Sequence, residues 1–396
     1  MRVLINAAGS NIGGAVTYLT NLLPQLARLQ VDAGRDDHFI VVAPSETIDK
    51  LHATLEEKCF SVEHYREPPV QNLKRVVFDQ IRIPRLIRQH AADLLFSANG
   101  FGTLRPGCPE ALLIRNPIYF CPIYERRLRE LGRSLRAIRL RRYMSLISIR
   151  SADLILFPTQ AMLDLARPYG GLRSRDARVI HYGFNRETFF REGAGRPAIA
   201  DAMREWRAEG KRVLLGVSAF AIHKNFDTLV EAMPELIERG CETRLVLTIA
   251  REQTGDVKDF DDLLRRIETL GLDDAVHLPG HVPYEQLQHL YAESDLFVFP
   301  SFAESFGHSM VEAMACGLPS VAADIPVNRE VLAGSASYFE SFDPKSCAAA
   351  ISEVLCQTDV ARTLRAAAEL QARNFSWSAY AISLLDEFEQ LLGGPR

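Results

Sequence analysis

The chain has 396 residues, 47% of them hydrophobic and 24% charged, which is enough for two or three globular domains that each bury a full core. Its seven cysteines include no Cys-x-x-Cys pair, so free thiols in a reducing compartment are expected rather than a disulfide framework or a cysteine metal site. The formal net charge of −4, together with the lack of a recognisable nucleic-acid module, argues against a nucleic-acid partner.

The N-terminal half alternates short apolar runs with amphipathic stretches. The first run, within Met1–Gly9, is too short for a signal-peptide core, and no stretch is apolar enough to span a bilayer, so we expect a cytoplasmic protein. The apolar runs predict strands at Val3–Ala7, Phe39–Ala43, Asp93–Ser97, Ala111–Arg115, Leu154–Phe157 and Val179–His181. Amphipathic stretches between them, such as 15–29 and 79–89, indicate a parallel sheet with helices on both faces.

A break follows at residues 191–197, whose Gly and Pro content is typical of a linker, and the alternation then starts again. Further strands are predicted at Arg212–Val217, Leu245–Ile249, Val276–Leu278, Leu296–Phe299 and Ser320–Ala322. A last helix, 376–392, opens with Ser376 as its cap. We therefore predict an α/β fold of two Rossmann-like, doubly wound domains facing a cleft. Their expected bounds are 1–190 and 191–375, with 376–396 packing back on the first domain.

The two predicted domains differ in charge. Residues 1–190 contain more Lys and Arg than Asp and Glu, whereas the remainder contains more Asp and Glu. Opposite signs suggest that the domains face different partners.

The residues with the clearest chemistry lie between 295 and 319. A buried strand ends at Pro300, and a loop leads into a helix that stops at Gly317. The start of that helix presents backbone N–H groups and a positive dipole end, which suits an anion such as a diphosphate. Glu304 lies in the loop and Glu312 in the helix, and a carboxylate can accept hydrogen bonds from two sugar hydroxyls.

A second candidate segment, residues 216–225, follows the first strand of the second domain. It contains Ser218, His223 and Lys224 just before a predicted helix. Lys224 suits a phosphate group as a compact positive charge, although an ordinary surface lysine is the alternative.

The first domain contributes three further candidates. Gly13 and Gly14 close a glycine-containing turn after the first strand, where the backbone can approach a ligand closely. Arg115 and Asn116 follow the strand at 111–114, with a structural ion pair as the alternative role for Arg115. Residues 126–142 hold eight arginines interleaved with Leu, Ile and Tyr, a pattern found at anionic membrane surfaces. A solvated helix face or a partner contact explains the same pattern.

Glu304 and Glu312, with seven residues between them, resemble the Glu-x7-Glu motif of the retaining glycosyltransferases of the GT-B fold, family 4, or glycosyl transferases group 1. The segments 279–295 and 317–321 resemble the family's base-framing segment and the turn and strand after its motif. The resemblance implies that Glu304 and Lys224 are catalytic and that Glu312 binds the ribose. It also implies donor contacts by Phe306, Gly307, His308, Ser309, Val282, Ser218 and His223, and acceptor or cleft contacts by Gly13, Gly14, Arg115 and Asn116.

Two positions depart from the family pattern. The family usually has an Arg five positions before the Lys, where Ala219 stands here, so His223, a helix dipole or another Arg would have to complete the diphosphate clamp. The family also often has a His after the fourth strand of the first domain, where Arg115 or Asn116 takes its place.

The resemblance implies a hexosyltransferase that retains anomeric configuration and needs neither a metal nor a cofactor besides its nucleoside-diphosphate sugar. A glycan or lipid-linked glycan is the expected acceptor. The residues at 223–225 resemble those of mannosyl- and rhamnosyl-type enzymes of surface polysaccharide biosynthesis. Separately, the basic stretch 126–142 suggests a cytoplasmic protein that is peripheral at the inner face of the membrane. A nucleotide-sugar epimerase of the same fold and a non-catalytic sugar-nucleotide binder are the alternatives. A Rossmann oxidoreductase is disfavoured because no Gly-x-Gly-x-x-Gly motif is present.

Overall fold

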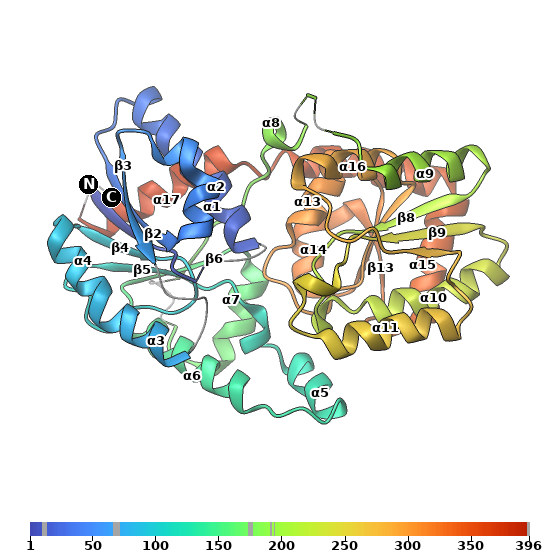
Figure 1. The fold of residues 1–396 in the computed structure, drawn as a ribbon, viewed down its shortest axis with the longest axis horizontal. Helices are drawn as coiled ribbons and strands as arrows, with labels where there is room; N and C mark the ends of the chain where they lie inside the picture. The colour runs from blue at the N-terminus through green and yellow to red at the C-terminus, as the bar shows by residue number, and fades with distance from the viewer. Residues whose placement is uncertain (10–13, 66–71, 173–176, 191, 194, 394–396) are drawn as a thin grey trace. The chain divides into compact units, whose positions relative to one another are not determined.

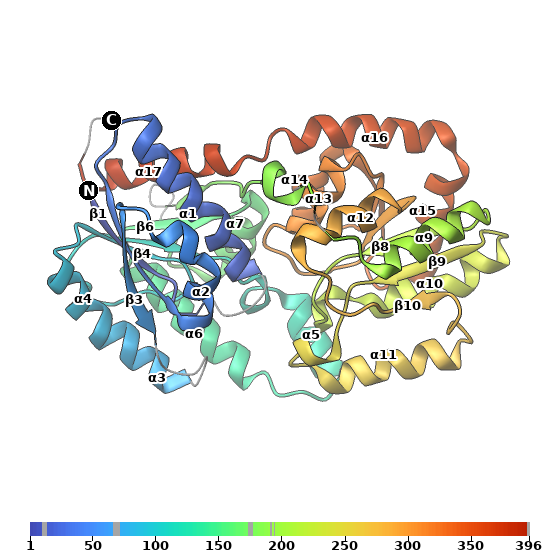
Figure 2. The same ribbon diagram turned by 45° about the horizontal axis from the view of Figure 1, so that its top comes forward.

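The computed structural model describes residues 1–9, 14–65, 72–172, 177–190, 192–193 and 195–393. The chain divides into two compact units, one formed by residues 1–183 and 376–396 and the other by residues 184–375. Each unit is built on a parallel sheet with helices on both of its faces (Figures 1 and 2).

The described residues of the first unit form a seven-stranded parallel sheet in the order β3-β2-β1-β4-β5-β6-β7. Its strands are β1 (Arg2–Asn6), β2 (His38–Pro44), β3 (Phe60–Tyr65), β4 (Leu94–Ser97), β5 (Glu110–Leu113), β6 (Leu154–Phe157) and β7 (Ala177–Val179). Its helices are α1 (Gly14–Asp32), α2 (Ser45–Leu55), α3 (Asn72–Val77), α4 (Ile83–His90), α5 (Pro122–Glu130), α6 (Arg136–Ser151), α7 (Gln160–Ala166) and α17 (Trp377–Leu391), with a π-helical turn at Phe78–Arg82. The central strands are almost wholly apolar and buried, as expected for a parallel sheet covered on both faces.

The second unit repeats this design with six described strands in the order β10-β9-β8-β11-β12-β13. Its strands are β8 (Arg212–Gly216), β9 (Thr243–Leu247), β10 (Val276–His277), β11 (Leu296–Phe299), β12 (Ser320–Ala323) and β13 (Ala336–Phe339). Its helices are α8 (Arg186–Phe189), α9 (Ala198–Ala208), α10 (Phe226–Glu238), α11 (Val257–Thr269), α12 (Leu287–Ala292), α13 (His308–Ala315), α14 (Pro326–Leu332), α15 (Pro344–Cys356) and α16 (Thr358–Ala372). In each sheet the strand order reverses at a switch point, β1 and β4 in the first and β8 and β11 in the second. The loops after these strands meet there, at the carboxyl edge.

All the predicted strands are present within about two residues, but β3 and β13 were not predicted. Both lie at a sheet edge, where half of their side chains are only partly buried and polar residues interrupt the apolar pattern. The predicted cap of the last helix is confirmed, since Ser376 Oγ accepts a hydrogen bond from Ala379 N at 3.3 Å. That helix, α17, lies beside α1, and the hydroxyl oxygens of Tyr18 and Tyr380 are 2.6 Å apart (Figure 1).

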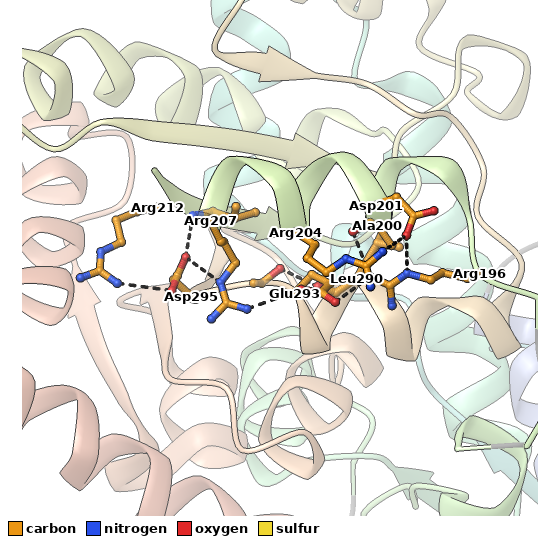
Figure 3. A network of polar contacts seen from close by, with 11 residues as sticks. Arg196, Ala200, Asp201, Arg204, Arg207, Arg212, Leu290, Glu293 and Asp295 are labelled. Carbon is orange, nitrogen blue, oxygen red and sulfur yellow. Dashed lines mark hydrogen bonds and ion pairs between the residues drawn. The ribbon is translucent and has the colours of Figure 1, made fainter. Parts of the chain in front are cut away.

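A network of charged residues occupies the amino-terminal edge of the second sheet (Figure 3). Asp295, just before β11, accepts a hydrogen bond from the backbone of β8 at 2.9 Å. Arg207 and Arg212 each lie 3.5 Å from the Asp295 carboxylate. Glu293 pairs with Arg196 at 2.6 Å and with Arg207 at 3.6 Å. This network ties α9 and α12 to the start of β8 and β11.

Candidate active site in the second unit

The loops that follow β8 and β11 are joined by hydrogen bonds at the carboxyl edge of the second sheet. The His223 carbonyl oxygen accepts hydrogen bonds from Ser301 Oγ and from the backbone N–H of Phe302, both at 3.0 Å. Asn225 Nδ2 donates to the Pro300 carbonyl oxygen at 3.3 Å. Asn225 has a φ of 54°, a left-handed conformation that Asn tolerates, and it ends the turn from which α10 starts. The two loops therefore form one layer at the switch point, where open α/β sheets bind ligands.

Lys224 and Glu304, one from each loop, form an ion pair in that layer. Their Nζ and Oε1 atoms are 2.5 Å apart, and the side chains are 18% and 9% exposed. Ser301 Oγ also donates to Glu304 Oε1 at 2.8 Å. Burial alone would raise the pKa of Glu304, but attraction to Lys224 and the two hydrogen bonds outweigh it, so the pKa is lowered. Glu304 is therefore an ionised carboxylate, able only to accept hydrogen bonds.

Gly307 sets the start of α13, the helix that follows the Glu304 loop. Its φ is 85°, a left-handed conformation that strains any residue with a Cβ, so the position favours glycine. The first turn of α13 contains no acidic residue, so no first-turn carboxylate offsets the positive end of its dipole. Phe306 packs its ring against Phe375, with the ring centroids 5.4 Å apart.

Glu312 lies inside α13 and is buried, with an exposed fraction of 4%. Its Oε2 accepts a hydrogen bond from the Tyr291 hydroxyl at 2.9 Å, and the same hydroxyl lies 3.2 Å from the Ser309 carbonyl oxygen. Burial raises the pKa of Glu312 to about 7. Tyr291 was not predicted as a site residue, although it belongs to the segment that resembles the base-framing part of the family.

The other predicted donor-site residues occupy loops of the same unit. Half-buried Ser218 and His223 follow β8, buried Val282 follows β10, and half-buried His308 and Ser309 begin α13. Burial and repulsion from Lys224 lower the pKa of His223 to about 4. Its imidazole is therefore neutral at pH 7 and does not supply the positive charge that is missing at Ala219.

The predicted residues of the first unit have structural partners of their own. Arg115 lies over the Tyr18 ring, 5.7 Å from its centroid. Asn116 caps a short 3-10 turn by accepting a hydrogen bond from the backbone of Ile118 at 3.2 Å. Gly14 begins α1 and is exposed, whereas Gly13 lies outside the described residues.

The basic stretch 126–142 covers the end of α5 and the start of α6. Buried Glu125 pairs with Arg129, Arg139 and Arg142, so part of the positive charge is balanced within the stretch. Leu140 and Tyr143 of α6 are 53% and 60% exposed beside these arginines.

Among the described residues, no group of three or more His, Cys, Asp or Glu side chains is arranged to hold a metal ion. No helix within the described ranges has both the length and the apolar character needed to cross a bilayer.

Comparison with known proteins gives matches to both halves of the chain. Residues 12–188 match the family described as Glycosyltransferase Family 4, and residues 200–371 match Glycosyl transferases group 1. Mannosylfructose-phosphate synthase of Agrobacterium fabrum is 33% identical over 44% of this chain and 38% of its own length. D-inositol 3-phosphate glycosyltransferase of Frankia alni is 32% identical over 54% of this chain and 53% of its own length. The chain thus spans about half of these relatives or less.

Sucrose-phosphate synthase from Thermosynechococcus elongatus is similar in structure, with a TM-score of 0.77 at 18% identity and 99% of both chains covered. This likeness shows the fold, two Rossmann-like units, as the sequence predicted.

Proposed function

The chain belongs to the GT-B glycosyltransferases of family 4 and group 1, and on that basis we propose that it moves a hexose from a nucleoside-diphosphate sugar to a carbohydrate acceptor with retention of configuration. The observation that carries the proposal is the partly buried Lys224–Glu304 ion pair, which lies at the switch point of the second sheet, in the loops that lead into α10 and α13.

Lys224 and the start of α13 would hold the donor diphosphate. An ammonium group has three N–H donors, so Lys224 can keep its bond to Glu304 and still reach phosphate oxygens. When the bond between the sugar C1 and the diphosphate breaks, the leaving group takes the electron pair, and Lys224 offsets the charge that develops. Residues 217–225 and 300–307 contain no Lys or Arg besides Lys224. Within these two loops, Lys224 is therefore the residue that can offset the negative charge of the diphosphate.

The two carboxylates would hold hydroxyl groups. Ionised Glu304 accepts hydrogen bonds from the donor sugar, and Glu312 accepts them from the ribose. Tyr291 occupies Oε2 of Glu312 and thereby fixes the direction of the other oxygen.

For the sugar and the acceptor we propose mannose or rhamnose and a glycan or lipid-linked glycan bound by the first unit. The exposed Leu140 and Tyr143, beside the arginines of 126–142, support a peripheral contact with an anionic membrane, because a cationic helix face with apolar side chains suits that surface. Replacing Arg139, Arg141 and Arg142 with Ser would then weaken binding to anionic vesicles.

A second acceptor class is a small phosphorylated sugar or cyclitol. The names of the three relatives given above, two synthases of sugar phosphates and an inositol-phosphate glycosyltransferase, favour it.

A panel of nucleoside-diphosphate sugars, each incubated with and without acceptors of both classes, tests the proposal. We expect nucleotide release that depends on the acceptor. A new sugar nucleotide formed without acceptor would instead identify an epimerase, and binding without turnover would identify a non-catalytic binder.

A further inference from the structure

Two cysteines that are 115 positions apart in the sequence meet at the amino-terminal edge of the second sheet. Cys241 lies in the turn between α10 and β9, and Cys356 is the last residue of α15. In a parallel sheet each covering helix runs back from the carboxyl edge, so α10 and α15, which pack against each other, end at the same edge (Figure 1). The ends of these helices bring the two Sγ atoms to 4.0 Å from each other.

The backbone on both sides of this contact is fixed by helix ends. Gly240, with a φ of 77°, ends α10 in the left-handed conformation, and the N–H of Cys241 donates to the carbonyl oxygen of Leu236 at 3.0 Å. At the end of α15, the N–H of Gln357 donates to the carbonyl oxygen of Glu353 at 2.9 Å. The proximity of the two sulfur atoms is therefore a property of the folded unit.

The two thiols differ in their access to solvent. Cys356 is exposed, whereas Cys241 is 9% exposed and belongs to the hydrophobic core of the second unit. Burial raises the pKa of Cys241, although Arg239 attracts its thiolate form. Ser352 Oγ lies 4.0 Å from each sulfur, a weak contact that does not keep the sulfurs apart. The exposed thiol is therefore the one that reaches a dissolved oxidant first, and the buried thiol lies beside it.

We propose that Cys241 and Cys356 are a redox-active pair that closes to a disulfide when the protein is exposed to hydrogen peroxide. The sulfur atoms need to approach from 4.0 Å to about 2.05 Å, which side-chain rotation at the last residue of a helix can supply. The thiolate of Cys356 attacks the O–O bond and becomes a sulfenic acid, with release of one water molecule. The sulfur of Cys241 then displaces the sulfenic oxygen as a second water. Two thiols thus lose two electrons, and one peroxide becomes two water molecules.

The disulfide acts on the stability of the second unit. It closes a loop of residues 241–356, which runs from β9 to α15, and so lowers the entropy of the unfolded chain. It also fixes the end of α10, the helix that begins just after Lys224 and Asn225. We expect oxidation to raise the melting temperature by about 5 °C or more. Because the disulfide lies at the opposite edge of the sheet from Lys224, binding of nucleoside diphosphates should not change.

The test treats the whole chain with a small molar excess of hydrogen peroxide and identifies disulfides by mass spectrometry of an unreduced, alkylated digest. The wild type should lose two of its seven thiols and give a cross-linked peptide that joins Cys241 to Cys356. Dithiothreitol should restore both thiols. Cys356→Ser and Cys241→Ala should give no such peptide and no rise in melting temperature. Cys59→Ser, which alters a half-buried cysteine of the first unit, is the matched control and should behave as the wild type.

The exposed position of Cys356 makes its replacement compatible with folding, which a melting curve of the reduced variant checks. The formation of the disulfide is measured without any glycosyl transfer, so its failure is distinct from a failure of the proposed function. Cross-links between other cysteines in place of this pair, or dimers joined through Cys356, would overturn the inference. A disulfide between Cys241 and Cys356 that leaves the melting temperature unchanged would overturn its stabilising role.

Discussion

Strands β8 and β11 carry ion pairs at both of their ends, and the two ends are built differently. At the amino-terminal end, Asp295 has two arginines and a backbone N–H as partners, and Glu293 has two arginines (Figure 3). At the carboxyl end, Lys224 and Glu304 have mainly each other, next to a helix start whose left-handed φ at Gly307 favours glycine. Dense mutual pairing serves stability, whereas a cation with a single carboxylate partner keeps N–H donors for a ligand.

The largest expected effect of this difference is on catalysis. Lys224→Ala should lower kcat by roughly 100- to 1,000-fold, because it removes the cation that offsets the leaving diphosphate. The fold should persist, because burial then raises the pKa of Glu304 and the carboxyl group can stay neutral. Steady-state kinetics with the best donor of the panel, together with a thermal melt, provide the measurement.

Lys211→Ala is the matched control. Lys211 and Glu209 also lie 2.5 Å apart, but this pair is at the amino-terminal end and Glu209 is 57% exposed. The control should keep full activity. Equal losses of kcat in Lys224→Ala and Lys211→Ala would contradict a catalytic role that belongs to the carboxyl end alone.

The next effect concerns the pH dependence of stability. Burial raises the pKa of Glu312 to about 7, while an unfolded glutamate titrates near about 4.3. Between these values the folded state binds more protons than the unfolded state, so the free energy of unfolding falls as pH rises, by up to roughly 4 kcal/mol. Glu312→Gln should abolish this slope and gain stability relative to the wild type between pH 5 and pH 8. Urea titrations across that range measure it.

Glu110 in the first unit is the comparison for Glu312. It is 1% exposed, and burial raises its pKa to about 7 as well. Glu110→Gln should therefore remove a similar slope. Only Glu312→Gln should also weaken nucleoside-diphosphate binding, by about tenfold, because it removes the charge that accepts ribose hydroxyls. The neighbouring Tyr284, Tyr291 and Cys316 have raised pKa values and do not titrate in this range. An unchanged affinity of Glu312→Gln for nucleoside diphosphates would show that Glu312 does not contact the ligand.

The sequence predicted the central strands and the loop–helix containing Glu304 because long apolar runs and Gly or Pro boundaries are local signals. The sequence could not predict where the Arg75 side chain lies. Hydrogen bonds to Asp79 of the π-helical turn and to Asn6 of β1 hold it, and both contacts depend on the folded unit. Tyr291 was missed for a similar reason, since its hydroxyl reaches Glu312 across 21 positions of the chain. His223 was considered as a substitute cation, and only its burial in the folded unit shows that it is neutral. Side chains that act through long-range packing leave no local pattern.

The smallest expected effect tests the amino-terminal end itself. Glu293→Gln breaks the pairs with Arg196 and Arg207, whose side chains are 29% and 39% exposed, so solvent already screens much of the attraction. The free energy of unfolding should fall by only about 0.5–1 kcal/mol, and the difference from the wild type should shrink in 1 M salt. Because the network lies at the opposite edge of the sheet from Lys224, kcat should not change. A large loss of activity with a small loss of stability would mean that the amino-terminal end also positions the loops of the site.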